Sequence, residues 1–161
     1  MITQQQALDL FDYQDGKLYW RVKKAYRVEI GKEAGCKNSH GYCVVRVDGV
    51  LYGAHRIVFL MHHGYLPEYV DHIDGNPLNN KIENLRQATN VENCYNRGKQ
   101  SNNKSGCKNV HWKAKIKHWS VEIQVNKVKK YLGIYKDLEL AALVAAEARD
   151  LYHGKFARQG A

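Results

Sequence analysis

The 161-residue chain has no long apolar run, no C-x-x-C pair, and almost no acidic residues over about a quarter of its length. Without an apolar stretch of roughly 18 residues, a membrane-spanning helix is not expected. The first residues, MITQQQALDLF, lack the basic residues and the apolar run of a secretory signal. We therefore expect a soluble, cytoplasmic protein with no membrane partner.

The four cysteines lie far apart, at Cys36, Cys43, Cys94 and Cys107. Structural zinc sites usually draw their ligands from closely spaced pairs, and none occurs here. In a cytosolic protein such cysteines are interpreted as free thiols. A zinc site assembled from distant Cys and His residues stays open as the alternative.

Acidic residues are scarce from position 97 to position 136. This segment holds eleven Lys or Arg residues and one acid, Glu122, so its net charge is +10. The remaining 14 basic and 15 acidic residues leave −1 for the rest of the chain. Concentrated positive charge with aromatics nearby indicates a polyanionic partner, most often nucleic acid. The alternative is a solvated, solubilising face.

Three zones are visible along the first part of the chain. Alternating runs around D-G turn signals predict a small antiparallel sheet over residues 1–53. The stretch AHRIVFLMHHG predicts a short, largely buried helix that ends at Gly64. Beyond it, YVDHI and NLRQAT predict two strands around a loop, and Thr89 or Asn90 is expected to cap a helix with Glu92 in its first turn.

Residues 98–107 contain almost no apolar side chains and predict a flexible linker. Three short strands are expected after it, followed by a helix between Asp137 and Gly154. We therefore expect an α+β fold with domains at 1–97 and 108–161. In the second domain, a three-stranded sheet packs on one helix and leaves its polar, basic face free.

The stretch VDHIDGNPLNNKIENLRQATNVENCYNR combines an Asp-His pair with seven asparagines. Hydrolysis of a phosphodiester needs a base near neutral pH, which histidine supplies, and a divalent ion to stabilise charge. A hard ion such as Mg²⁺ prefers carboxylate and amide oxygens. His72 is the candidate base, Asn84 the acceptor for its imidazole N–H, and Asp71 and Asn93 the candidate ligands. The alternative is an asparagine-rich turn.

Residues 55–97 resemble the HNH endonucleases in their D-H-I-D-G-N opening, N-N-x-x-x-N-L-R middle and final E-N. The resemblance implies a ββα-metal core in which Asp71 and Asn93 bind the metal. It implies that His72 is the general base and that Asn84 orients it. Asparagine at position 93 is similar to the phage and homing-endonuclease branch. That likeness implies Mg²⁺ or Mn²⁺ rather than zinc.

Residues 105–158 resemble the DNA-binding domain of plant ethylene-response factors in the Y-L-G-x-Y turn, the Ala-rich helix and HGKFAR. This resemblance implies that the three-stranded sheet enters the major groove of double-stranded DNA. Lysines replace most of the plant arginines, and lysines mostly contact phosphates rather than read bases. The residues expected to contact DNA are Arg56, Arg86, Arg97, Lys108, Lys113, Lys115, Lys117, Lys127, Lys129 and Tyr131.

The leading hypothesis is a metal-dependent DNA endonuclease or nickase of phage or mobile-element origin. It needs one divalent ion, no small-molecule cofactor, and acts as a monomer or weak dimer. One rival is a non-catalytic DNA-binding regulator, which would need a broken catalytic set. Another is an RNA-binding or RNA-cleaving protein, which would expose stacking aromatics. The free face of the middle strand instead carries His, Ser, Glu, Gln and Asn.

Four further positions have both a structural and a functional interpretation. His55 and Arg56 could pack at the start of a helix or contact a phosphate. Asp74 is expected to shape the loop, with metal contact as the alternative. Trp112 could lie in the core or face DNA.

Overall fold

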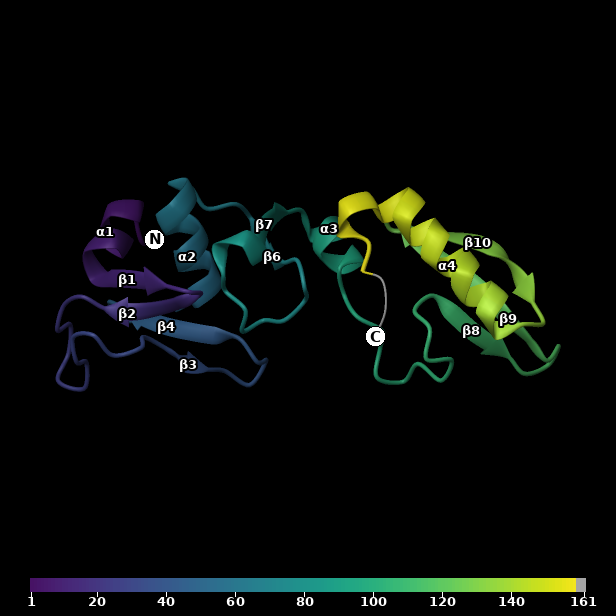
Figure 1. The fold of residues 1–161 in the computed structure, drawn as a ribbon, viewed down its shortest axis with the longest axis horizontal. Coiled ribbons are helices and arrows are strands. Elements are labelled where there is room, and N and C mark those ends of the chain that lie inside the picture. The colour runs from purple at the N-terminus through teal and green to yellow at the C-terminus, as the bar shows by residue number, and fades with distance from the viewer. Residues whose placement is uncertain (159–161) are drawn as a thin grey trace. The chain divides into compact units, whose positions relative to one another are not determined.

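The computed structural model describes residues 1–158 and shows two compact units, Met1–Ala88 and Thr89–Ala161 (Figure 1). Each unit mixes helices with small antiparallel sheets, in agreement with the predicted α+β class. The domain boundaries expected at residues 97 and 108 stay a prediction. The segment from 98 to 107 belongs to the second unit, where Asn103 Nδ2 donates to Cys107 O and Ser105 Oγ to Val110 O.

The first unit contains three helical elements and three sheets among its residues. The helices are α1 (Gln4–Leu10), α2 (Ala54–His63) and the 3-10 turn η1 (Ile82–Asn84). The sheets are β1 (Phe11–Gln14) with β2 (Lys17–Trp20), β3 (Cys36–Lys37) with β4 (Cys43–Val47) and β5 (Val50–Gly53), and β6 (Tyr69–His72) with β7 (Leu85–Ala88). The predicted sheet of residues 1–53 is therefore two separate small sheets.

Two hairpins of this unit turn at the D-G signals. Asp15 and Gly16 have φ of 48° and 86°, and Asp48 and Gly49 have φ of 47° and 82°. Positive φ at both central residues is the geometry that closes a two-residue hairpin with the correct strand twist. The turns that the sequence predicted are thus confirmed at both sites.

Helix α1 was not expected from the sequence. Thr3 accepts a hydrogen bond from the Gln6 backbone N–H, and the Gln6 side chain accepts from the Thr3 backbone N–H. This capping box stabilises the first turn, and the T-x-x-Q pattern that encodes it is present in the sequence. Figure 1 shows α1 beside α2 on one side of the β1–β2 hairpin.

Helix α2 confirms the predicted short, buried helix. Gly64 ends it in the left-handed conformation at φ 77°, and its N–H donates to Leu60 O. The apolar side chains from Ile57 to Met61 are buried. They pack with Phe11, Leu18 and Val45 in one core. This core supports the strand β6, which carries Asp71 and His72.

The second unit contains α3 (Asn90–Tyr95), a three-stranded antiparallel sheet and α4 (Leu138–His153), followed by η2 (Gly154–Phe156). The sheet order is β10 (Val128–Tyr135), β9 (His118–Val125), β8 (Val110–Lys113). Asp137 caps α4, and Figure 1 shows this helix lying along the sheet.

Small side chains bring α4 close to the sheet. Ala141 and Ala145 are fully buried and pack with Val110 and Val121. Trp119 packs against the same cluster, which confirms the predicted core side of β9. The predicted sheet with one helix on one face is therefore present.

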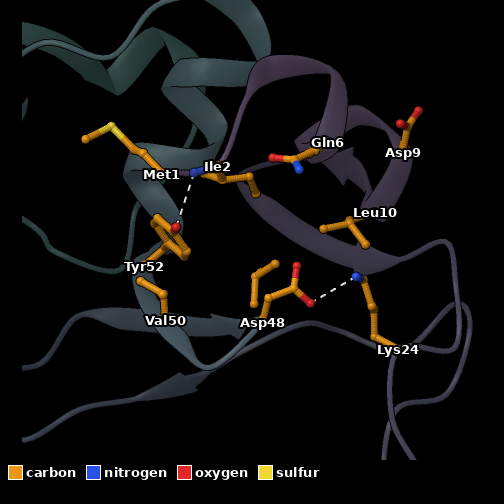
Figure 2. Close-up of a pocket in the computed structure, with 10 residues that line it drawn as sticks. Met1, Ile2, Gln6, Asp9, Leu10, Lys24, Asp48, Val50 and Tyr52 are labelled. Carbon is orange, nitrogen blue, oxygen red and sulfur yellow. Dashed lines mark hydrogen bonds and ion pairs between the residues drawn. The ribbon is translucent and has the colours of Figure 1, made fainter.

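One pocket lies in the first unit, near the N-terminus. It has a volume of about 390 Å³ and is lined by residues such as Ile2, Asp48 and Tyr52. Figure 2 shows the Ile2 backbone N–H donating to the Tyr52 hydroxyl and Asp48 paired with Lys24. None of the residues predicted for the site lines this pocket.

None of the helices within residues 1–158 is long and apolar enough to cross a membrane.

Candidate functional site

His72 is the last residue of β6 and is 5 % exposed. Its ring Nε2 lies 2.9 Å from Asn80 Oδ1. An amide oxygen only accepts hydrogen bonds, so Nε2 donates to it and carries the ring hydrogen. In the neutral ring the other nitrogen is then the proton acceptor. Asn80 is itself 4 % exposed, which fixes this tautomer inside the protein.

Two more rings surround His72. The centroid of the His55 ring lies 5.1 Å from that of His72, and the Tyr42 ring 6.0 Å from it. His55 lies in the first turn of α2, and its Nδ1 is buried without a hydrogen-bond partner among residues 1–158. Burial, with the nearby His72 and Arg56, lowers the pKa of His55 to about 3. His55 therefore packs beside the base as a neutral ring.

Asp71 precedes His72 on β6 and is also 5 % exposed. Arg86 on β7 is its cross-strand partner and donates from Nε at 2.8 Å and from Nη2 at 2.7 Å, both to Oδ2. A buried carboxylate is costly without a counter-charge, and Arg86 provides one. The structure thus brings together Asp71, a predicted metal ligand, and Arg86, a predicted DNA contact.

Asp74 organises the loop between β6 and β7. It accepts hydrogen bonds from the Asn76 backbone at 2.8 Å, Asn79 Nδ2 at 2.8 Å and Asn84 Nδ2 at 2.9 Å. Burial opposes ionisation, but these hydrogen bonds outweigh it and lower the pKa of Asp74. The structure therefore supports the loop-shaping interpretation of Asp74 and explains several of the asparagines.

Asn84 takes part in the same loop. Its Oδ1 accepts from the Asp74 backbone N–H at 3.0 Å, and its Nδ2 donates to Asp74 Oδ1 and to Asn79 O. The recorded hydrogen bond of the His72 ring goes instead to Asn80. Direct orientation of His72 by Asn84 stays a prediction, whereas Asn84 joins the two ends of the loop that carries Asn80.

Asn93 lies on α3, in the second unit, and is half-buried. Thr89 caps this helix in a capping box with Glu92, which settles the choice between Thr89 and Asn90 as cap. Within residues 1–158, no recorded hydrogen bond occupies the Asn93 side-chain amide. The role of Asn93 as a ligand beside Asp71 stays a prediction.

Two of the residues predicted to contact DNA donate hydrogen bonds to backbone carbonyl oxygens of the protein itself. Arg56 donates to Glu68 O at 3.0 Å and to Pro67 O at 3.1 Å, so it ties α2 to the segment before β6. Lys108 donates from Nζ to Tyr95 O at 2.7 Å. Burial, with Arg149 and Arg158 nearby, lowers the pKa of Lys108 to about 8. Both residues have a structural task, and their DNA contacts stay predictions.

The free face of the C-terminal sheet centres on Glu122. Its carboxylate lies 3.2 Å from Lys113 Nζ and 3.7 Å from Lys129 Nζ, across all three strands. Tyr131 pairs with Glu122 on β10 and is 61 % exposed. Burial acts against it, but the contacts with Lys113, Ser120 and Lys129 lower the pKa of Glu122. Lys113, Lys129 and Tyr131 therefore share one face of the sheet, and their contacts with DNA stay predictions.

Trp112 pairs with Trp119 across β8 and β9, and their ring centroids lie 4.7 Å apart. Directly paired residues of antiparallel strands point to the same face. Trp112 is thus on the helix side of the sheet with Trp119, although it is half exposed. Of the two interpretations of Trp112, this placement supports the one on the helix side of the sheet and not the one on the free face.

Four predicted cations are exposed: Arg97, Lys115, Lys117 and Lys127. No recorded ion pair within residues 1–158 involves them. Lys115 and Lys117 lie in the turn between β8 and β9, and Lys127 in the turn between β9 and β10. Because no recorded ion pair within residues 1–158 holds them, these four side chains are the predicted DNA contacts most available to phosphates.

The structure records no group of three or more His, Cys, Asp or Glu that could hold a metal ion within residues 1–158. The four cysteines are free thiols, as expected. A site built from one carboxylate and one amide oxygen would not form such a group, and its donor atoms are those of a hard ion.

Sequence reasoning missed two residues beside the base, Asn80 and the packed ring of His55. Asn80 is one of the seven asparagines in the stretch from 70 to 97, and the N-N-x-x-x-N-L-R motif that contains it did not link it to His72. His55 could be placed on a helix, but its contact with His72 depends on how α2 packs against β6. Glu122 was placed on the free face of the middle strand, but its contacts with Lys113 and Lys129 were not predicted.

Comparison with known proteins gives concordant results. A family model described as HNH endonuclease matches residues 52–95, which include His55, His72 and Asn93. Protein 3.8 of Escherichia phage T7 is 36% identical over 98 residues, which cover 60% of this chain and 80% of that protein. An HNH endonuclease of Acanthamoeba polyphaga mimivirus is 38% identical over 88 residues, 53% of this chain and 43% of that protein. No solved structure gives a significant match. Residues 52–95 therefore form an HNH endonuclease family domain, and the chain is a relative of the phage T7 protein.

Proposed function

We propose that the protein is a metal-dependent DNA endonuclease in which His72 is the general base. The observation that carries the proposal is the buried pair on β6. His72 is held in one tautomer by Asn80, and Asp71 is neutralised by Arg86. Both residues lie inside the segment matched by the HNH endonuclease model. A base held in one tautomer and a buried carboxylate are what phosphodiester hydrolysis requires.

His72 removes a proton from the attacking water. Because Asn80 accepts the Nε2 hydrogen, the ring stays in one orientation and does not have to reorganise before it accepts the proton. His55, neutral and packed beside it, adds no positive charge that would oppose protonation of His72. These contacts make His72 a positioned base rather than a surface histidine.

Asp71 and Asn93 are the proposed ligands of one Mg²⁺ or Mn²⁺ ion. The donor set fits such an ion, because it offers one buried carboxylate and one amide oxygen that no recorded hydrogen bond occupies within residues 1–158. When bound, the ion stabilises negative charge on the phosphate and on the leaving oxygen. Arg86 pairs with the Asp71 carboxylate and holds it in place on β6.

The proposed substrate is double-stranded DNA, cut on one or both strands. The basic C-terminal sheet, with its likeness to ethylene-response-factor domains, would bind the duplex. Its lysines would contact phosphates, while Glu122 keeps Lys113 and Lys129 on one face. The protein would act in the cytoplasm of a host cell as a phage or mobile-element nuclease of the homing type, as a monomer or weak dimer.

The decisive experiment incubates supercoiled plasmid with the protein and Mg²⁺, with and without EDTA, beside a parallel reaction on single-stranded RNA. The proposal expects nicked or linear plasmid with Mg²⁺, no cutting with EDTA, and little cutting of RNA. An intact plasmid under every condition, despite tight DNA binding, would favour the regulator instead. Preferential cutting of RNA would favour the RNA-cleaving rival.

A further inference from the structure

Helix α3 is too short to be stable alone. It has six residues, Asn90–Tyr95, and isolated helices of fewer than about 12 residues are marginal in water. The Thr89–Glu92 capping box stabilises only its first turn. Its position therefore depends on what its C-terminal end contacts.

The side chain of Tyr95 provides the main contact. Its ring stacks on the His153 ring with centroids 3.7 Å apart and an interplanar angle of 7°. Its hydroxyl accepts from the Asn126 backbone N–H at 2.8 Å and donates to Asn126 Oδ1 at 3.2 Å. Both the ring and the hydroxyl of Tyr95 therefore contact other residues of the second unit.

The backbone at the end of α3 is held as well. Lys108 Nζ donates to Tyr95 O at 2.7 Å, and Arg158 Nη1 lies 3.5 Å from Asn96 O. Cations at the C-terminal carbonyls of a helix satisfy free acceptors and favour the helix dipole. Asn96 is 5 % exposed, so this end of the helix is buried.

All these contacts come from the three-stranded domain. His153 ends α4, Asn126 lies in the turn between β9 and β10, and Lys108 precedes β8. Figure 1 shows α3 beside the C-terminal end of α4. Asn93 lies two residues before Tyr95, on the helix that these contacts hold.

We propose that Tyr95 is a positioning residue for the nuclease, because it binds α3 to the three-stranded domain and thereby fixes Asn93. The inference rests on the proposed function of Asn93 as a metal ligand. It adds that the C-terminal domain supports catalysis through α3, in addition to holding DNA. A chain cut at the polar segment 98–107 would lose the support of α3 as well as the DNA contacts.

The test compares Tyr95→Ala with Tyr95→Phe and with Tyr26→Ala, a control at a tyrosine that is 94 % exposed. Tyr95→Phe keeps the ring stack on His153 and loses only the two bonds to Asn126. Hydrogen exchange over residues 89–97 reports α3, because the Asn93 N–H donates to Thr89 O. Single-turnover cleavage at saturating DNA with Mg²⁺ reports catalysis, and DNA affinity is measured in EDTA. Circular dichroism verifies that each variant is folded.

Tyr95→Ala is expected to speed exchange of α3 and to slow cleavage, each at least ~10-fold, with DNA affinity within about twofold of wild type. Tyr95→Phe is expected to recover most of both losses, and Tyr26→Ala to match wild type. Unchanged exchange in Tyr95→Ala, or faster exchange with unchanged cleavage, would overturn the proposal. If Asn93→Ala cuts as fast as wild type, the metal assignment fails, and the catalytic part of this proposal fails with it. The exchange data would still decide whether Tyr95 holds α3.

Discussion

At the scale of single residues, the base is defined by its neighbours. His72 contacts one amide, Asn80, and two rings, His55 and Tyr42. A histidine with a fixed partner has one proton-accepting nitrogen, whereas an unrestrained ring samples both tautomers. Asn80, which accepts the hydrogen bond from His72, can therefore be tested by mutation.

Asn80→Ala is expected to slow single-turnover cleavage by about 10- to 100-fold, as removal of the partners that orient metal-bound histidines does. Binding of DNA should be unchanged, because Asn80 is buried. Asn80→Asp keeps an oxygen acceptor and should recover much of the rate. If Asn80→Ala cuts at the wild-type rate and Asn84→Ala does not, the orienting residue is Asn84.

The lowered pKa of His55 makes stability depend on pH. The unfolded chain binds a proton at His55 near pH 6.5, while the folded chain keeps it neutral down to about pH 3. The folded state therefore loses stability as pH falls from 6.5 toward 3. Between pH 7 and pH 5 this group alone costs roughly 2 kcal/mol of unfolding free energy.

Urea unfolding of wild type and His55→Gln at pH 7 and pH 5 checks this expectation. The variant can be less stable at both values, but its loss between pH 7 and pH 5 should be smaller by roughly 2 kcal/mol. Equal losses in the two proteins would mean that His55 takes up a proton in the folded state.

At the scale of elements, the β1–β2 hairpin supports the loop that carries Asn80. The ideal Cβ position at Gly16 lies 2.9 Å from Lys81 N, and the Ile82 N–H donates to the Tyr13 hydroxyl at 3.0 Å. Asp15 pairs with Lys81 at 2.7 Å. One hydrogen bond, one ion pair and the close approach of Gly16 therefore join this hairpin to residues 80–82, which include the partner of His72.

Gly16→Ala is expected to slow cleavage, because its methyl group would displace the backbone at Asn80 and Lys81. Gly31→Ala is the matched control. Both glycines have positive φ, 86° and 79°, but no atom lies within 4 Å of the Cβ position at Gly31. Both variants should lose about 1 kcal/mol or more of stability from backbone strain. Slow cleavage only in Gly16→Ala supports the account, and equal rates in the two variants contradict it.

The elements differ in how far the sequence predicts them. Helix α2 and the D-G hairpins follow from local signals, such as apolar periodicity and left-handed turns, and the structure confirms them. Alternation along β9 correctly places Trp119 on the core side. Helix α1 begins with a capping box whose T-x-x-Q pattern is present in the sequence.

Contacts between distant elements could not be predicted from the sequence. Nothing local to Tyr95 indicates that its ring stacks on His153, and nothing near His55 indicates that it touches His72. Such pairs depend on how helices and strands pack, which residue spacing does not encode. The candidate set Asp71, His72, Asn84 and Asn93 came from spacing and resemblance, but the partner of the base came from the fold.

At the scale of the whole molecule, charge and chemistry lie in different segments. Residues 97–136 carry +10, and the rest of the chain carries −1. If about four to six lysines contact phosphate, the slope of log affinity against log salt should be about −4 to −5, at roughly −0.9 per contact.

The structure indicates which lysines to change. Lys115, Lys117 and Lys127 are exposed, and no recorded ion pair within residues 1–158 involves them. Replacing all three with Ala should flatten the slope to about −2, and weaken binding to all sequences alike. A control variant that replaces Lys23, Arg27 and Lys37, exposed in the first unit, loses the same charge and should keep the wild-type slope. Equal slopes in the two variants would indicate that the basic segment is only a solvated face.

The central claim is that His72 is the base of a nuclease, and single-turnover cleavage of plasmid by His72→Ala tests it most directly. At saturating DNA with Mg²⁺, the variant should cut about 10²- to 10⁴-fold more slowly than wild type, the usual contribution of general-base catalysis. Its DNA affinity in EDTA should be unchanged, since His72 is buried. Cutting by His72→Ala at the wild-type rate would contradict the account.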